Sequence, residues 1–267
     1  MNKPFYACLQ KDSKEFFRSK RNLLFASTLL GLCVFVMLST KLLPGLIGQL
    51  AEKAAQMIAD PTTLQDALNT LFPEDLKGNL GIFASDVVIF YGLVTTLSCY
   101  NLVPAESRTG RWIFPLGVGY SPRTMVLSKA LVYGIGAATP AIIFYNVYFA
   151  LGSLLLTVNL NWDVALINSL VLGFVMFVTV YLTVVLAAIS KRPVSAAISI
   201  LVTLVAAPDI FTLFAFGKYL PTHLITYLAT ASDKPGELLI PLAGTILVVV
   251  CCSLPVTGKN IPVETNR

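Results

Sequence analysis

Few side chains in this sequence could carry out catalysis. The chain of 267 residues has a single histidine, His223, and no GxSxG, HExxH or paired-carboxylate arrangement surrounds it. It also has no Walker A sequence, so it cannot hydrolyse ATP in the manner of P-loop enzymes. We therefore predict that the chain is not an enzyme and has no catalytic residues.

The cysteines indicate neither a metal site nor a disulfide framework. No CxxC pair and no histidine partner is present, and four of the five cysteines fall in or at the edge of apolar runs. We interpret them as small, polarisable packing residues and predict no bound metal. They are Cys8, Cys33, Cys99, Cys251 and Cys252.

Two carboxylates fall inside long apolar runs, where ionisable groups are costly and often functional. Asp86 lies near the outer end of its run and could simply reach the membrane interface. Asp209 follows Pro208 and could bind a cationic substrate group or interact with Lys218; the sequence leaves both alternatives open. Asp86 and Asp209 are the candidate residues of a substrate pathway.

The elements that carry these residues are predicted to be membrane-spanning helices. The chain is 56% hydrophobic and 12% charged, with a mean hydropathy of +0.77, whereas roughly a quarter of the residues in a soluble domain are charged. In a bilayer, backbone groups must pair internally, so each apolar run has to form a helix. We predict an all-α, polytopic transmembrane helical bundle in the cell (plasma or inner) membrane, with a single transmembrane domain over residues 1–267. The six expected spans are 22–40, 82–103, 128–157, 164–190, 194–216 and 238–255.

The basic residues predict the orientation of the bundle. If the N-terminus is cytoplasmic, 14 of the 19 lysines and arginines lie in inner segments and 5 in outer segments. This asymmetry satisfies the positive-inside rule, and six spans return the C-terminus to the cytoplasm. The net charge of +5 therefore reflects membrane topology and does not indicate a nucleic-acid partner.

Two segments outside the spans have helical patterns of their own. Residues 41–81 form the longest outer loop and predict two short helices, about 43–58 and 62–72, that rest on the outer leaflet, cover the spans or form part of a substrate gate. Residues 1–21 predict a basic amphipathic helix in the membrane interface, where its cations would face anionic lipids. A plain cluster of topogenic charges is the alternative. The apolar face of this helix is Phe5, Leu9 and Phe16, and its cations are Lys11, Lys14 and Arg18.

The cytoplasmic segment 104–127 is too apolar for an ordinary loop and too interrupted for a span. Trp112 and Phe114 lie among arginines, and a glycine, Gly110, permits a tight turn. We expect these aromatic side chains to be exposed to water unless a partner covers them. Apolar residues rimmed by arginines are typical of a docking surface for a soluble protein.

The order of these elements resembles the permease subunits of type-2 ABC exporters, the ABC-2 family. Glu106 and Arg108 match the start of the family's loop after span two, and Ser121, Arg123 and Lys129 match its end. The resemblance is specific only over about 105–129, and Pro115, Gly117 and Gly119 depart from the family's apolar helix. It implies short outer helices over 217–237, a homodimer, and separate cytoplasmic ABC ATPase subunits that hold ATP and magnesium, with no cofactor on this chain. The coupling residues it implies are Glu106, Arg108, Gly110, Arg111, Trp112, Phe114 and Arg123.

The expected function is that of the membrane-spanning permease subunit of an ATP-driven exporter. A secondary transporter is the first alternative, disfavoured because membrane carboxylates are scarce and no internal repeat is present. An intramembrane enzyme lacks catalytic groups, and a non-transporting assembly or immunity subunit remains a further alternative. The substrate stays open among peptides, drugs, lipid-linked glycans and ions.

Overall fold

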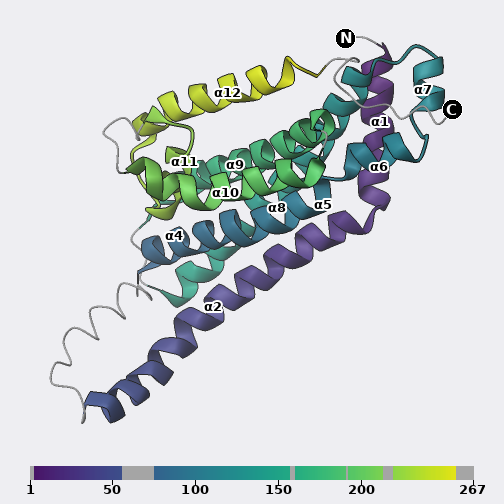
Figure 1. Cartoon of the computed structure of the whole chain (residues 1–267). Helices are drawn as coiled ribbons and strands as arrows, with labels where there is room; N and C mark the ends of the chain where they lie inside the picture. The colour runs from purple at the N-terminus through teal and green to yellow at the C-terminus, as the bar shows by residue number, and fades with distance from the viewer. Residues whose placement is uncertain (1–2, 56–74, 157–159, 191, 213–218, 257–267) are drawn as a thin grey trace.

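The computed structural model describes residues 3–55, 75–156, 160–190, 192–212 and 219–256. In these ranges the regular elements are helices, which confirms the all-α class for the described part of the chain (Figure 1). They are α1 (Lys3–Arg18), α2 (Lys20–Ala55), α4 (Leu76–Asp86), η1 (Val87–Tyr91), α5 (Gly92–Cys99), α6 (Leu102–Arg108), α7 (Ile113–Gly117), α8 (Pro122–Leu155), α9 (Trp162–Ile189), α10 (Pro193–Thr212), α11 (His223–Ala229), η3 (Pro235–Leu238) and α12 (Leu239–Ser253).

Five helical segments in the described ranges are long and apolar enough to cross a membrane. About 18 residues at roughly 1.5 Å each approach the thickness of the hydrocarbon layer. These five segments support a membrane protein, but within the described residues they are one fewer than the six spans that the sequence predicts. The predicted span that is not among them, 194–216, corresponds to α10. The apolar part of α10, Pro193–Ala206, is shorter than the five candidate spans, and the end of the predicted span lies outside the described residues. The five segments are Lys20–Thr40, Leu76–Arg108, Pro122–Leu155, Trp162–Ile189 and Pro235–Ser253.

The helices on both sides of the first predicted outer loop extend into residues 41–81. α2 continues without interruption to Ala55, so the helix expected over 43–58 is not separate from the first span up to that residue. The second expected helix, 62–72, lies outside the described residues. α4 already begins at Leu76 rather than at 82, because the Asp75 carboxylate caps it by accepting a hydrogen bond from the Gly78 N–H at 3.3 Å.

Small residues hold α8 and α9 together at the centre of the bundle. A methyl group added at Gly134 would lie 2.8 Å from the ring of Phe177 and 3.2 Å from its carbonyl oxygen. A methyl group at Gly173 would likewise meet Ile142 at 2.5 Å. The sequence places Ala130, Gly134 and Ala138 at four-residue spacing, and the close packing that such a ridge predicts is confirmed.

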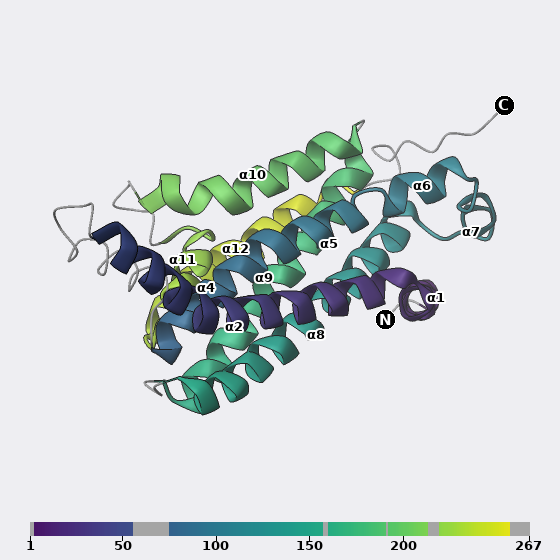
Figure 2. The same ribbon diagram turned by 90° about the horizontal axis from the view of Figure 1, so that it is seen from below.

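Helix α1 crosses one end of the bundle at a steep angle to α2 (Figures 1 and 2). The chain bends at Ser19, whose hydroxyl donates to the Phe16 carbonyl oxygen at 2.8 Å and so separates α1 from α2. α1 packs mainly on α8 through a buried stripe of Cys8, Asp12 and Phe16 at four-residue spacing. α6 and α7 lie at this same end.

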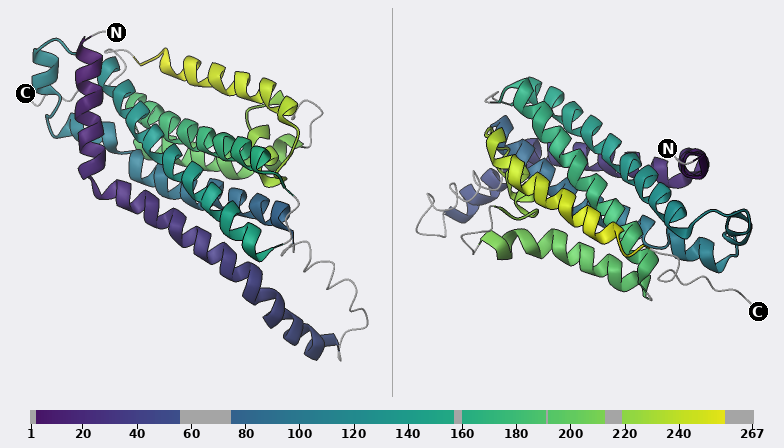
Figure 3. Two further views of the ribbon diagram at one scale, coloured as in Figure 1. Left: turned by 180° about the vertical axis from the view of Figure 1, so that it is seen from behind. Right: turned by 90° about the horizontal axis from the view of Figure 1, so that it is seen from above.

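The opposite end of the bundle carries the short helices α11 and η3, which overlap the predicted outer segment 217–237 (Figures 1 and 3). α11 approaches α4 so closely that a methyl group added at Gly81 would collide with the carbonyl oxygen of Ala229. Glycine at this position therefore lets the two helices meet backbone to backbone.

Candidate functional site: a buried ion cluster

A cluster of buried ion pairs lies where α1, α6 and α8 meet. At its centre is Lys129, whose side chain is only 2% exposed. Its Nζ lies 3.0 Å from Glu106 Oε1, 3.2 Å from Asp12 Oδ1 and 3.3 Å from Glu15 Oε2. We call these four residues the ion cluster. It connects the N-terminal helix with residues more than a hundred positions away in the chain.

Local structure brings each member to the ion cluster. Asp12 and Glu15 are three residues apart on α1, so they project from neighbouring positions on one face of that helix. Glu106 lies in the last turn of α6. Ser121 caps the start of α8 by accepting a hydrogen bond from a backbone N–H, and Lys129 follows two turns later.

Trp112 covers the ion cluster on the side of the turn between α6 and α7. Its indole Nε1–H donates to Glu106 Oε2 at 3.2 Å, and the side chain is 1% exposed. The turn that brings it back requires Gly110, whose φ of +71° favours glycine. The expectation that Trp112 lies in water is therefore wrong. The chain itself buries the ring, because a carboxylate of the cluster satisfies the indole N–H.

The other predicted coupling residues differ in exposure. Phe114 is 80% exposed on the short helix α7, beside the exposed Ile113. Arg108, Arg111 and Arg123 are exposed as well. Exposed apolar side chains and exposed arginines thus occur together in this segment, and the apolar ones include Ile113 and Phe114. Unlike these residues, Glu106 faces the interior.

The charges of the cluster are unevenly matched. Asp12 Oδ2 accepts a hydrogen bond from the Ser128 hydroxyl, while its Oδ1 faces Lys129. Burial of Asp12 raises the pKa of its carboxyl, and the lysine opposes this only in part. Lys11, half exposed, approaches both Asp12 Oδ1 and Glu106 Oε1 at 4.0 Å. Three carboxylates therefore share two ammonium groups.

The residues proposed for a substrate pathway lie elsewhere. Asp86 is half-buried at the end of α4, directly before the π-helical turn η1, a feature that often marks functional positions in helices. Asp209 falls on α10, and its side chain lies outside the described residues. His223 begins α11, at the end of the bundle opposite the ion cluster.

Sequence reasoning included Lys129 but missed Asp12 and Glu15. The available signal was the position of Asp12, which lies four residues after Cys8 and four before Phe16. A carboxylate in the buried stripe of an otherwise basic helix requires a buried cation as its partner. The sequence could not say which of the distant lysines that partner is.

The carboxylates of the cluster enclose an ammonium group. In the ranges that the structure describes, no group of three or more histidine, cysteine, aspartate or glutamate side chains could hold a metal ion. Comparison with known proteins gives no assignment, since no protein-family model and no curated protein matches the chain. The functional interpretation therefore depends on the sequence and on the geometry of the ion cluster.

Proposed function

We propose that the chain is the membrane permease subunit of an ATP-driven exporter of the ABC-2 type, the family that its sequence resembles. Two copies would form the substrate pathway, and separate cytoplasmic ATPase subunits would bind ATP and magnesium. One observation carries this proposal. The ion cluster joins the segment α6–α7, which carries the exposed Ile113 and Phe114, to α1 and to the long apolar helix α8.

The ion cluster supports a mechanical role for the α6–α7 segment. Trp112 holds the turn to Glu106, Glu106 pairs with Lys129 of α8, and Lys129 pairs with carboxylates of α1. Breaking a buried ion pair by removing one partner costs about 3–5 kcal/mol. A force on α7 would therefore move α1 and α8 together instead of only bending the loop.

The exposed surface of α7 supports a protein partner for that force. Covering a large apolar side chain such as Phe114 gains about 1.5–3 kcal/mol. Arginines are among the commonest anchors of protein interfaces, and the exposed Arg108 and Arg111 precede Ile113 and Phe114 in the chain. In this proposal the protein lies in the cell membrane, and the end of the bundle that carries the ion cluster faces the cytoplasm. Asp86 and Asp209 are candidates for contact with the substrate.

The test is to purify the tagged chain in mild detergent from the membranes of its native host. We expect a protein with a Walker A sequence to co-purify in fixed ratio, together with vanadate-sensitive ATP hydrolysis. The variant Ile113→Asp/Phe114→Asp should lose both, because it places charges in the contact. The matched control Ile113→Leu/Phe114→Leu keeps the surface apolar and should retain both.

Two results would contradict the proposal. One is a wild-type preparation that carries no vanadate-sensitive ATP hydrolysis. The other is an aspartate variant that retains the ATPase as fully as the leucine control, which would remove α7 as the docking site.

A further inference from the structure

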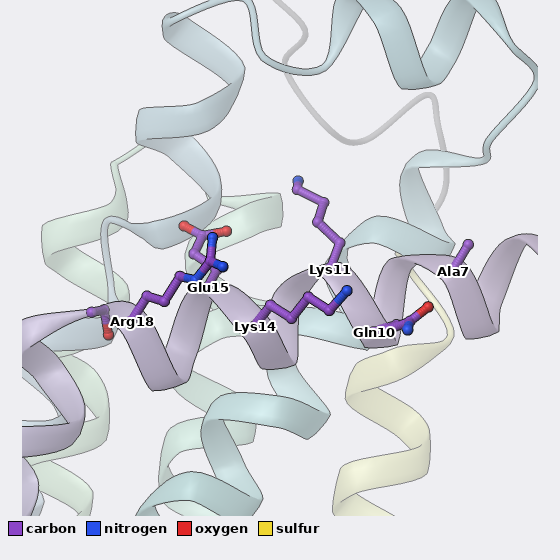
Figure 4. Close-up of a pocket in the computed structure, with 7 residues that line it drawn as sticks. Ala7, Gln10, Lys11, Lys14, Glu15 and Arg18 are labelled. Atoms are coloured by element: carbon purple, nitrogen blue, oxygen red, sulfur yellow. The ribbon is translucent and has the colours of Figure 1, made fainter.

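Two grooves meet along helix α1. The first lies between α1 and the middle of α8, has a volume of about 690 Å³ and is lined mainly by apolar side chains, among them Phe17, Ile135 and Ile143. The second, which we call the polar groove, is a shallow and open surface on the neighbouring side of α1; it is formed by residues of this helix and Ser19, most of them polar or charged (Figure 4). Both are lined by Gln10 and Lys14, so an apolar groove adjoins a polar one at these two residues.

The apolar groove has a fixed floor. The buried ring of Phe16 lies on Gly136 of α8, where an added methyl group would collide with it, and meets the ring of Tyr133 edge-on at 5.2 Å between centroids. Above this floor the side chains of Phe17 and Ile135 remain mostly exposed, Phe17 at 70%. Such a groove is suited to hydrocarbon, because its walls are apolar and its α8 side belongs to a helix long and apolar enough to cross a membrane.

The polar groove carries uncompensated positive charge. Glu15 lines it, but its carboxylate is paired with Lys129 in the ion cluster. Lys14 and Arg18 are exposed and form no ion pair with any side chain that the structure describes. Figure 4 shows the basic side chains projecting from this side of α1. The groove therefore favours an anion.

We propose that these two grooves together bind one anionic phospholipid of the membrane. An acyl chain would lie between α1 and α8 over Phe16, and the phosphate would lie at Lys14 and Arg18. The combination of an apolar groove with adjoining cations fits a lipid better than a peptide. In Figure 1, α1 crosses one end of the bundle, and an interfacial helix at such an end would bring Lys14 and Arg18 to the level of the headgroups. The site does not depend on the proposed transport function.

Native mass spectrometry of the full chain, titrated with dioleoyl-phosphatidylglycerol and with dioleoyl-phosphatidylcholine, tests the headgroup half of the site. We expect the first phosphatidylglycerol to bind more tightly than phosphatidylcholine. Lys14→Gln/Arg18→Gln should weaken that first binding roughly 30-fold, about fivefold for each cation lost near a phosphate. The matched control Lys20→Gln/Arg192→Gln removes the same charge outside the groove and should leave the affinity unchanged.

A second pair of variants tests the acyl-chain half. Thr139 lines the apolar groove and is exposed, so Thr139→Phe should fill the groove and weaken binding of both lipids, while Thr139→Ser should weaken neither. The proposal is overturned if the Lys14/Arg18 variant binds phosphatidylglycerol like the wild type, or if its charge control loses as much. It is also overturned if soluble glycerol 3-phosphate displaces the lipid at equal concentration, which would indicate a simple anion site.

Discussion

Among single residues, Lys129 has the most consequential environment. Three carboxylates lie within 3.3 Å of its Nζ, while the only other cation at the cluster, within the described residues, stands 4.0 Å from two of them. The cost of desolvating these groups is offset only while their mutual attraction persists. The stability of this end of the molecule should therefore be sensitive to each charge.

Replacing Lys129 by methionine should destabilise the protein strongly. The change keeps most of the length of the side chain but leaves the carboxylates of α1 and α6 without their central cation. We expect a loss of about 3–5 kcal/mol, measured as a lower midpoint of thermal unfolding in detergent.

The half-exposed Lys11 provides the control for this change. Lys11→Met removes the same charge from a solvated position and should cost less than about 1 kcal/mol. Equal midpoints for the two variants would show that the ion cluster contributes little to stability.

Asp12 should make stability depend on pH in a defined direction. Because burial raises the pKa of Asp12, the folded protein binds this proton more tightly than the unfolded chain does. The stability of the wild type relative to Asp12→Asn should therefore be highest below the unfolded pKa and fall as the pH rises through the raised, folded pKa. Thermal unfolding of both proteins across the acidic range measures this difference. If the stability of the wild type relative to Asp12→Asn instead rises with pH, the inferred rise of the Asp12 pKa on folding is wrong.

Among the elements, the contact between α1 and α8 depends on a residue without a side chain. Gly136→Val should displace Phe16 and loosen α1, at a cost of about 1–3 kcal/mol from overpacking. Gly31→Val is the matched control, since a methyl group at Gly31 meets nothing within 4 Å. Unfolding midpoints and limited proteolysis within α1 report the effect.

A compensating change identifies the cause of that loss. Adding Phe16→Ala to Gly136→Val should make the two losses less than additive, because the smaller side chain removes the collision. Strictly additive losses would mean that the valine acts through the conformation of α8 and not through the contact with α1.

For the whole molecule, the testable property is its orientation in the membrane. Thr109 at the end of α6 and Gly236 in η3 lie at opposite ends of the bundle. In a cysteine-free variant, a cysteine at Gly236 should react with an impermeant maleimide added to intact cells, and one at Thr109 should react only after permeabilisation. Labelling of the cysteine at position 109 from outside would show the opposite orientation and would contradict the proposal of a cytoplasmic ATPase partner.

Composition and periodicity alone determined the class of this protein. Long apolar runs leave a helix as the only backbone able to satisfy its hydrogen bonds in a bilayer, so the all-α bundle and the ridge on α8 could be predicted. The boundaries of the helices were less predictable from the average hydropathy. Asp75 caps α4 at its start and α2 continues to Ala55, and the average hydropathy indicates neither feature. The ABC-2 assignment remains a prediction.

Only the tertiary structure decided which charged and aromatic residues are buried. Trp112 has the same local surroundings as Phe114, yet one covers the ion cluster and the other is exposed to solvent. The difference arises because Glu106 offers the indole an acceptor after the turn at Gly110, while α1 brings Asp12 to Lys129 from more than a hundred residues away. Burial of a charge depends on a partner in space, and the spacing of residues along one segment does not contain that information.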